Sequence, residues 1–180
     1  EVPFMVRSDF PDVQAQTDLY ARVFDLMDNK PIVFRTLDIG GDKVLPYFNA
    51  FDEENPAMGW RAIRVALDRP AMLRQQLRAI INAANGRAVK IMFPMIADVS
   101  EFLAAKKTLQ AELTRADSRG QKLPIDIQLG AMLEVPALAF QLQTLLPHTD
   151  FLSIGSNDLM QFFFASDRGN PRLDNRYDAL

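Results

Sequence analysis

The sequence has no cysteine, a single histidine and no long hydrophobic run. The lack of cysteine excludes disulfide bonds and thiol catalysis within these 180 residues. No apolar stretch approaches the roughly 20 residues that a membrane-spanning helix needs, and the first residues do not resemble a signal peptide. Basic residues do not outnumber acidic ones, the net charge is −3, and no basic cluster suggests a nucleic-acid-binding surface. We therefore expect a soluble, cytoplasmic protein.

What is present is a hydrophobic fraction of 48%, enough for the core of one ordinary domain. Short, continuous apolar runs, several rich in β-branched or aromatic residues, predict strands over residues 32–34, 89–93, 127–133 and 151–154. Apolar residues at helical spacing predict helices over residues 11–27, 70–85, 99–113, 137–146 and 159–165. Asp98 and Glu101 form a capping-box pattern before the third of these helices.

Two segments do not fit this alternation simply. Residues 38–54 lack periodicity and contain Gly40-Gly41, which predicts a long loop. Residues 58–65 are compatible with a strand or a helix, and counting 58–62 as a short strand gives about five β/α units. Alternating strands and helices with fully apolar strands indicate a parallel sheet covered by helices. A (β/α)₈ barrel and a doubly wound sheet both meet this description, although the glycine fingerprint of the latter is absent.

Two carboxylates follow predicted strands at the point where each strand ends, Glu134 after residues 127–133 and Asp158 after residues 151–154. The carboxyl ends of parallel strands form one edge of the sheet, which is the active-site edge of a barrel. Two convergent carboxylates could hold a hard divalent cation such as Mg²⁺. The alternative is a pair of solvated loop carboxylates.

Three arginines occupy similar positions. Arg35 and Arg61 lie at the ends of apolar segments, Arg168 lies in the segment DRGN, and the amide of Asn157 precedes Asp158. Guanidinium groups suit the planar, two-pronged recognition of carboxylate and phosphate. Each arginine alone could be a structural ion-pair partner, but the set describes a site for an anion bound through a metal.

These residues lie in segments that together resemble the phosphoenolpyruvate-binding domain of enzyme I of the bacterial phosphotransferase system. The matching segments are RTLDIGGDK (35–43), LPY (45–47), ENP (54–56), GWRAIR (59–64), IMFPM (91–95), Glu134 with Pro136, SIGSNDLMQ (153–161) and DRGN (167–170). EVPFM (1–5) and MLEVP (132–136) look closer to the nitrogen-related enzyme I than to the sugar enzyme. Pyruvate phosphate dikinase and phosphoenolpyruvate synthase share the barrel and an Asn-Asp-Leu segment, but match the Arg35 loop less well.

The resemblance implies a (β/α)₈ TIM barrel, of which residues 1–180 would form about five central units. The barrel's first and last strands and the phosphohistidine domain would lie outside this sequence. Glu134 and Asp158 would chelate Mg²⁺, while Arg35, Arg61, Asn157 and Arg168 would hold phosphoenolpyruvate.

The resemblance also implies the reaction and its partners. The phosphoryl group would pass to a histidine on a separate domain and then to an HPr-like phosphocarrier protein, leaving pyruvate, in an enzyme that forms homodimers. The family's catalytic cysteine would lie outside this sequence, and His148 does not lie in the acceptor motif. The alternatives are a non-catalytic dimerisation or sensing module and the barrel of a dikinase or synthase.

Overall fold

The computed structural model describes residues 10–28, 30–39, 53–167 and 170–173. Its sheet has four parallel strands in the order β1-β2-β3-β4, which are β1 (Val33–Arg35), β2 (Val89–Phe93), β3 (Ile127–Leu133) and β4 (Phe151–Ile154). Each strand pairs with the next one in the sequence, so the strand order never reverses. A doubly wound sheet reverses at its switch point, whereas successive neighbours are the arrangement of a (β/α)₈ barrel, here present in part.

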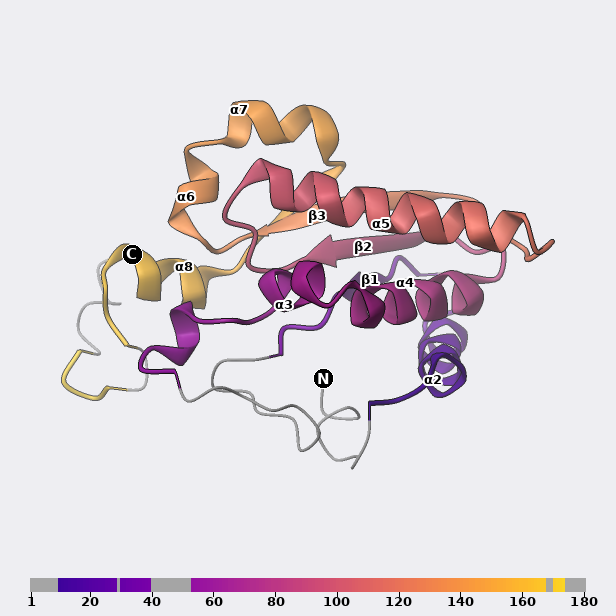
Figure 1. The fold of residues 1–180 in the computed structure, drawn as a ribbon, viewed down its shortest axis with the longest axis horizontal. Coiled ribbons are helices and arrows are strands. Elements are labelled where there is room, and N and C mark those ends of the chain that lie inside the picture. The colour runs from indigo at the N-terminus through magenta and orange to yellow at the C-terminus, as the bar shows by residue number, and fades with distance from the viewer. Residues whose placement is uncertain (1–9, 29, 40–52, 168–169, 174–180) are drawn as a thin grey trace.

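The helices lie along the sheet and at its ends (Figure 1). They are α2 (Val13–Leu26), α3 (Ile63–Asp68), α4 (Pro70–Ala84), α5 (Val99–Asp117), α6 (Pro136–Ala139), α7 (Leu142–Leu145) and α8 (Ser156–Phe163), with 3₁₀ turns η1 (Pro56–Met58) and η2 (Leu146–His148). Helices α4 and α5 pack against each other, α2 packs against α4, and α8 lies at the end toward which the strands run. No helix among the described residues is both long and apolar enough to span a membrane.

The main core lies between the sheet and these helices. Val89, Ile91 and Phe93 alternate along β2 and are buried, as expected when every second side chain faces the helices. Phe93 meets Phe102 of α5 in an edge-to-face contact with ring centroids 5.8 Å apart, and Phe34 of β1 meets Tyr20 of α2 in the same way at 4.9 Å. The other face of the sheet therefore carries the alternate residues, including Arg35.

Local sequence signals set where several helices begin or end. The capping box of Asp98 and Glu101 is formed, and Asn85 ends α4 in the left-handed conformation with φ 43°. The first helix begins at Val13 and not at Pro11, because Asp12 is its cap and accepts a hydrogen bond from the Ala15 N–H. The last helix begins at Ser156, three residues earlier than predicted.

Residues 58–65 are compatible with a strand or a helix from the sequence, and the structure has a helix from Ile63 and no strand over 58–62. A 3₁₀ turn ends at Met58, α3 begins at Ile63, and Arg61 makes only a single bridge. Ala62 has φ 51°, a left-handed conformation that bends the chain and ends any extended run. The described sheet accordingly has four strands and not five. The predicted loop at residues 38–54 lies mostly outside the described residues.

The helix predicted over residues 137–146 is broken into α6 and α7. Gln141 lies at the break, where its side-chain oxygen accepts a hydrogen bond from the Val99 N–H at 3.2 Å and its nitrogen donates to the Ala97 carbonyl at 3.0 Å. These bonds tie the break to the start of α5, so a tertiary contact replaces continuous helix.

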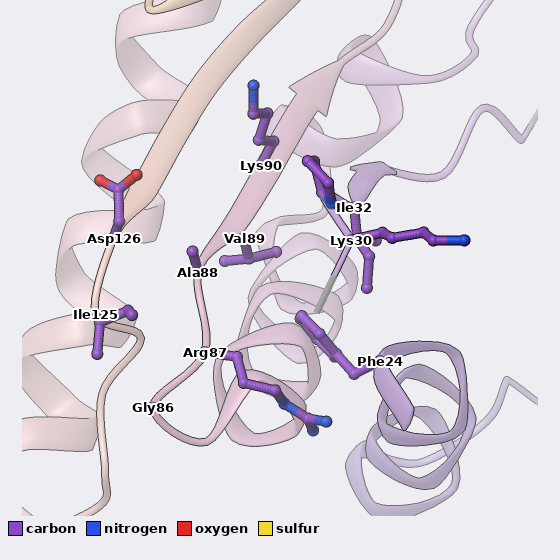
Figure 2. A pocket seen from close by; sticks show the side chains of 11 residues that line it. Phe24, Lys30, Ile32, Gly86, Arg87, Ala88, Val89, Lys90, Ile125 and Asp126 are labelled. Atoms are coloured by element: carbon purple, nitrogen blue, oxygen red, sulfur yellow. The ribbon is translucent and has the colours of Figure 1, made fainter. Parts of the chain in front are cut away.

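A hollow of about 450 Å³ lies at the amino ends of β1, β2 and β3 (Figure 2). Arg87, one of its lining residues, contacts both α4 and α2. Its guanidinium donates to the carbonyls of Ala83 and Ala84 at the end of α4 and to Asp25 of α2, and it stacks on the Phe24 ring. This end of the sheet is thus tied together by helix-end contacts.

Candidate functional site

A buried ion pair between Asp38 and Arg61 forms the centre of the site. Asp38 lies in the loop after β1 and is 1% exposed, while Arg61 lies just before α3 and is 3% exposed. Arg61 donates from Nε to Asp38 Oδ1 at 3.0 Å and from Nη2 to Asp38 Oδ2 at 2.7 Å. Buried charges need such pairing, and the two-pronged contact also fixes the plane of the guanidinium.

This pair connects two further side chains from other strand ends. Arg61 Nη2 lies 3.5 Å from Asp158 Oδ2 in the first turn of α8, and Arg35 Nη1 lies 3.9 Å from Asp38 Oδ2. Asp158 is buried despite its charge. The segments that follow β1 and β4 therefore meet the segment that precedes α3, as expected for the carboxyl edge of a parallel sheet.

Backbone contacts hold the Arg61 segment against the loop after β1. The Ala62 N–H donates to the Ile39 carbonyl at 2.9 Å, and the left-handed φ of Ala62 allows this approach. The Thr36 N–H donates to the Met92 carbonyl at 2.9 Å, which continues the β1–β2 ladder one residue past Arg35. The ion pair is thus supported by main chain on both sides.

Glu134 follows β3 and is also buried. Its Oε1 accepts a hydrogen bond from the Met95 N–H at 2.6 Å. Burial raises the pKa of Glu134 to about 7, and the charges of Asp158 and Asp38 add to the increase, although the Met95 N–H and Arg35 act in the opposite direction. Glu134 therefore lies within the electrostatic field of the Asp38–Arg61–Asp158 set.

Gly155 makes room for the Glu134 carboxylate. A Cβ atom at position 155 would lie 2.6 Å from Glu134 Oε2 and 2.8 Å from Glu134 Cβ. Any other residue would have to displace this carboxylate or the strand end that carries it. The glycine between β4 and α8 is thus required by a close approach and not by an unusual φ.

The donor set fits a hard cation better than a transition metal. Across the part of the chain that the structure describes, no group of three or more histidine, cysteine, aspartate or glutamate side chains is arranged to hold a metal ion. Glu134 and Asp158 are two oxygen donors, and Mg²⁺ is commonly held by one or two carboxylates with substrate oxygens and water completing its shell. The two buried carboxylates are compatible with such an ion in the chemistry of their oxygen atoms.

A pocket of about 640 Å³ opens beside this set, between η1 and α8. Arg61 and Asp158 line it, together with Gln161, Ser166 and Asp167 from the end of α8 and the residues after it. Its volume is in the range of small-molecule sites. Arg61 is the only cation among the described residues that line it, and Glu54, Asp158 and Asp167 are carboxylates.

The structure places the other predicted residues as follows. Asn157 is exposed in the first turn of α8, and Arg168 lies outside the described residues. His148 is exposed at the end of η2, before β4, and so lies at the opposite end of the strands. Asp38 was not singled out from the sequence, although it lies in the segment RTLD that follows a predicted strand.

Comparison with known proteins shows which family the chain belongs to. The model of the PEP-utilising enzyme, PEP-binding domain family matches residues 1–180. The chain is 45% identical over 177 residues to a phosphoenolpyruvate-protein phosphotransferase of Latilactobacillus sakei and to one of Priestia megaterium, and 44% identical to that of Bacillus subtilis. Each comparison covers 98% of this chain and 31% of the relative, so the chain spans about a third of the length of the curated relatives it matches. The chain therefore belongs to the PEP-binding domain family of the PEP-utilising enzymes.

Proposed function

We propose that this chain is the phosphoenolpyruvate-binding part of a cytoplasmic phosphoenolpyruvate–protein phosphotransferase. The observation that carries the proposal is the buried Asp38–Arg61 pair with Arg35 and Asp158 beside it, at the carboxyl edge of the sheet. Phosphoenolpyruvate carries a phosphate and a carboxylate, and each offers two oxygens that can accept a pair of hydrogen bonds from one guanidinium group. The names of the curated relatives support the same reaction.

The proposed substrate ligands are Arg35, Arg61, Asn157 and Arg168. Arg61 is held by Asp38 and so offers a fixed donor plane, while Arg35 is partly exposed and makes a longer contact. Asn157 lies in the first turn of α8, where an amide can approach a substrate from the helix N-terminus. The place of Arg168 rests on the DRGN segment alone.

Mg²⁺ is the proposed cofactor, held by Glu134 and Asp158. When bound, the ion would neutralise negative charge on the oxygens of the substrate and of the transition state. The chain's own contributions are the Met95 N–H that orients Glu134 and the glycine at position 155 that leaves space for it. Asp158 is oriented by its contact with Arg61.

The proposed reaction breaks the bond between phosphorus and the enol oxygen and forms a bond between phosphorus and a histidine nitrogen on a separate domain. The electron pair stays on the enolate, which takes a proton at carbon and becomes pyruvate. The phosphoryl group then passes from the histidine to an HPr-like phosphocarrier. Arg35 and Arg61 would stabilise the anionic groups during transfer. No catalytic acid is proposed among these 180 residues.

The wider assignment follows the resemblance found in the sequence. We propose that residues 1–180 form the central part of a larger TIM barrel, that the phosphohistidine domain lies elsewhere in the complete protein, and that the enzyme forms homodimers. The nitrogen-related branch is proposed from EVPFM and MLEVP alone.

The test uses the complete enzyme. Calorimetric titration with phosphoenolpyruvate should give binding in the presence of Mg²⁺ and a large loss of affinity after a chelator removes it. Dimerisation without any binding of phosphoenolpyruvate would overturn the proposal in favour of an assembly or sensing module. ATP-dependent formation of phosphoenolpyruvate from pyruvate would overturn it in favour of a dikinase or synthase.

A further inference from the structure

Gln76 is a polar side chain on the buried face of α4. It is 3% exposed, and its neighbours Leu73, Leu77 and Ile80 on the same helix are buried and apolar. An amide in such surroundings destabilises the fold unless its groups are hydrogen-bonded. Its partners therefore show what this position contributes.

The Gln76 amide binds the main chain on both sides of Thr36. Its Oε1 accepts from the Leu37 N–H at 2.9 Å, and its Nε2 donates to the Tyr20 hydroxyl at 3.0 Å and to the Arg35 carbonyl at 3.5 Å. Because a backbone N–H can only donate and a carbonyl can only accept, these partners fix which end of the amide faces which group. The amide thus binds the edge of the chain that faces away from β2, where β1 ends.

The chain still pairs with β2 at Thr36, whose N–H donates to the Met92 carbonyl. The Leu37 N–H and the Arg35 carbonyl lie on the other edge of the same chain, and both bond to Gln76. The main chain that Gln76 holds runs from the Arg35 carbonyl to the Leu37 N–H. Its path therefore fixes the positions from which the Arg35 and Asp38 side chains extend. Asp38 in turn holds Arg61 through two hydrogen bonds.

Tyr20 supports the amide from its other side. The hydroxyl comes from α2, and burial raises the pKa of Tyr20 to about 12, partly offset by its bond to Gln76. The phenol therefore stays neutral at physiological pH and remains a partner for the amide. The Tyr20 ring also packs on Phe34 of β1, so α2, α4 and the end of β1 are joined at one point.

We infer that Gln76 is a positioning residue for phosphoenolpyruvate, which orients Arg35 directly through the main chain and Arg61 indirectly through Asp38. This inference rests on the proposed function. Gln76 does not enter the pocket beside Arg61, whose lining comes from η1, α8 and the residues around them. Its effect on the reaction passes through the loop after β1.

Gln16 provides a matched control. It is also a buried glutamine, 1% exposed, on the inner face of α2. Its Nε2 donates to the Pro11 carbonyl at 2.8 Å, next to its own helix. Gln16→Met and Gln76→Met remove the same amide from equally buried positions, but only the second removes bonds to the loop after β1.

The experiment measures phosphoenolpyruvate kinetics, phosphoenolpyruvate binding and the thermal unfolding midpoint of the complete enzyme. Gln76→Met should lower kcat/KM about ten- to a hundredfold, because misplacing a binding group by about 1 Å can cost about a hundredfold. Gln16→Met should stay within about twofold of wild type in kcat/KM, even if its unfolding midpoint falls as far as that of Gln76→Met. Hydrogen exchange of the peptide containing Leu37 should become faster in Gln76→Met and not in Gln16→Met.

Equal changes in kcat/KM for the two variants, or a change that follows the unfolding midpoint alone, would show that Gln76 is only structural and overturn the inference. If Gln76→Met does not fold, Tyr20→Phe takes its place, since it removes only the hydroxyl. Unchanged kcat/KM and unchanged Leu37 exchange in Tyr20→Phe would then overturn the inference. Wild-type enzyme that does not bind phosphoenolpyruvate would refute the proposed function instead, and the exchange measurement would still test the role of Gln76 in holding the loop.

Discussion

Replacing Asp38 by asparagine removes one charge from the centre of the site and keeps the shape of the side chain. The Arg61 and Asp38 side chains are 4% and 2% exposed, with contacts of 3.0 and 2.7 Å. Removing one partner of a buried ion pair costs about 3–5 kcal/mol, because the other charge is left unpaired. Asp158, 3.5 Å from the same guanidinium, offers a substitute partner. We therefore expect a loss of stability near the lower end of this range, about 3 kcal/mol.

The substitute partner has a second consequence. If Arg61 turns fully to Asp158, this carboxylate is less available to Mg²⁺. A competing interaction of about 1.4 kcal/mol corresponds to about tenfold in affinity. In the complete enzyme, the Mg²⁺ concentration that gives half-maximal turnover should therefore rise about tenfold in Asp38→Asn, while the unfolding midpoint falls.

Glu112→Gln is the matched control for the loss of a buried charge. The Glu112 side chain is fully buried and joins α4 to α5, with Arg74 Nε at 2.7 Å and Arg78 Nε at 2.9 Å. Burial acts to raise the pKa of Glu112, but the two arginines outweigh it and the pKa is lowered. This variant should lower the unfolding midpoint without changing the Mg²⁺ requirement. An unchanged requirement in Asp38→Asn, or an equal rise in Glu112→Gln, would refute the reasoning.

The remaining predictions concern the groups around this pair, each measured in the complete enzyme. Arg35→Lys should reduce kcat/KM about thirty- to several-hundredfold, since lysine keeps the charge but loses the two-pronged geometry, and near-normal turnover would make Arg35 a structural partner. Glu134→Gln and Asp158→Asn should each raise the Mg²⁺ requirement steeply in a metal titration of turnover, and an unchanged requirement would exclude the residue as a ligand. Gly155→Ala should weaken Mg²⁺-dependent phosphoenolpyruvate binding measured by calorimetry, because its Cβ would lie 2.6 Å from Glu134 Oε2, and wild-type affinity would show that the carboxylate can move without cost.

The strands and long helices were predictable because their signals are local. Residues 89–93, 127–133 and 151–154 are strands at the predicted bounds. The capping box at Asp98 begins its helix as expected, and the turn at Asn85 ends its helix as expected. The failures came where a distant contact decides the conformation. Residues 58–62 were compatible with a strand or a helix, and they are not a strand, because the chain bends at Ala62, whose N–H donates to the Ile39 carbonyl. Gln141 breaks a predicted helix by bonding to the segment before α5.

The position of Arg35 and Asp158 at one edge followed from the topology, since groups that leave parallel strands at their carboxyl ends lie at the same edge of the sheet. Arg61 reaches this edge from the segment before α3 and not from a strand. The residue that orients each of these groups could not be predicted from the topology, because it depends on how the helices pack against the sheet. Asp38 meets Arg61 across 23 residues of sequence, and Gln76 meets Leu37 across 39.

Gln16 and Gln76 show why the pattern of the sequence is insufficient here. Both are glutamines on the apolar face of a helix, and a hydrophobic pattern treats both as the same exception. In the fold, Gln16 bonds to a carbonyl five residues away, whereas Gln76 joins two helices to the end of β1. A polar residue inside an apolar face predicts a buried partner for at least one of its groups, because burying an unpaired polar group is costly. Gln16 meets this with its nitrogen alone, since its Oε1 has no hydrogen-bond partner among the described residues. Which partner it takes, and so whether the residue serves a helix end or the geometry of a site, is decided only when the crossover helices pack against the sheet.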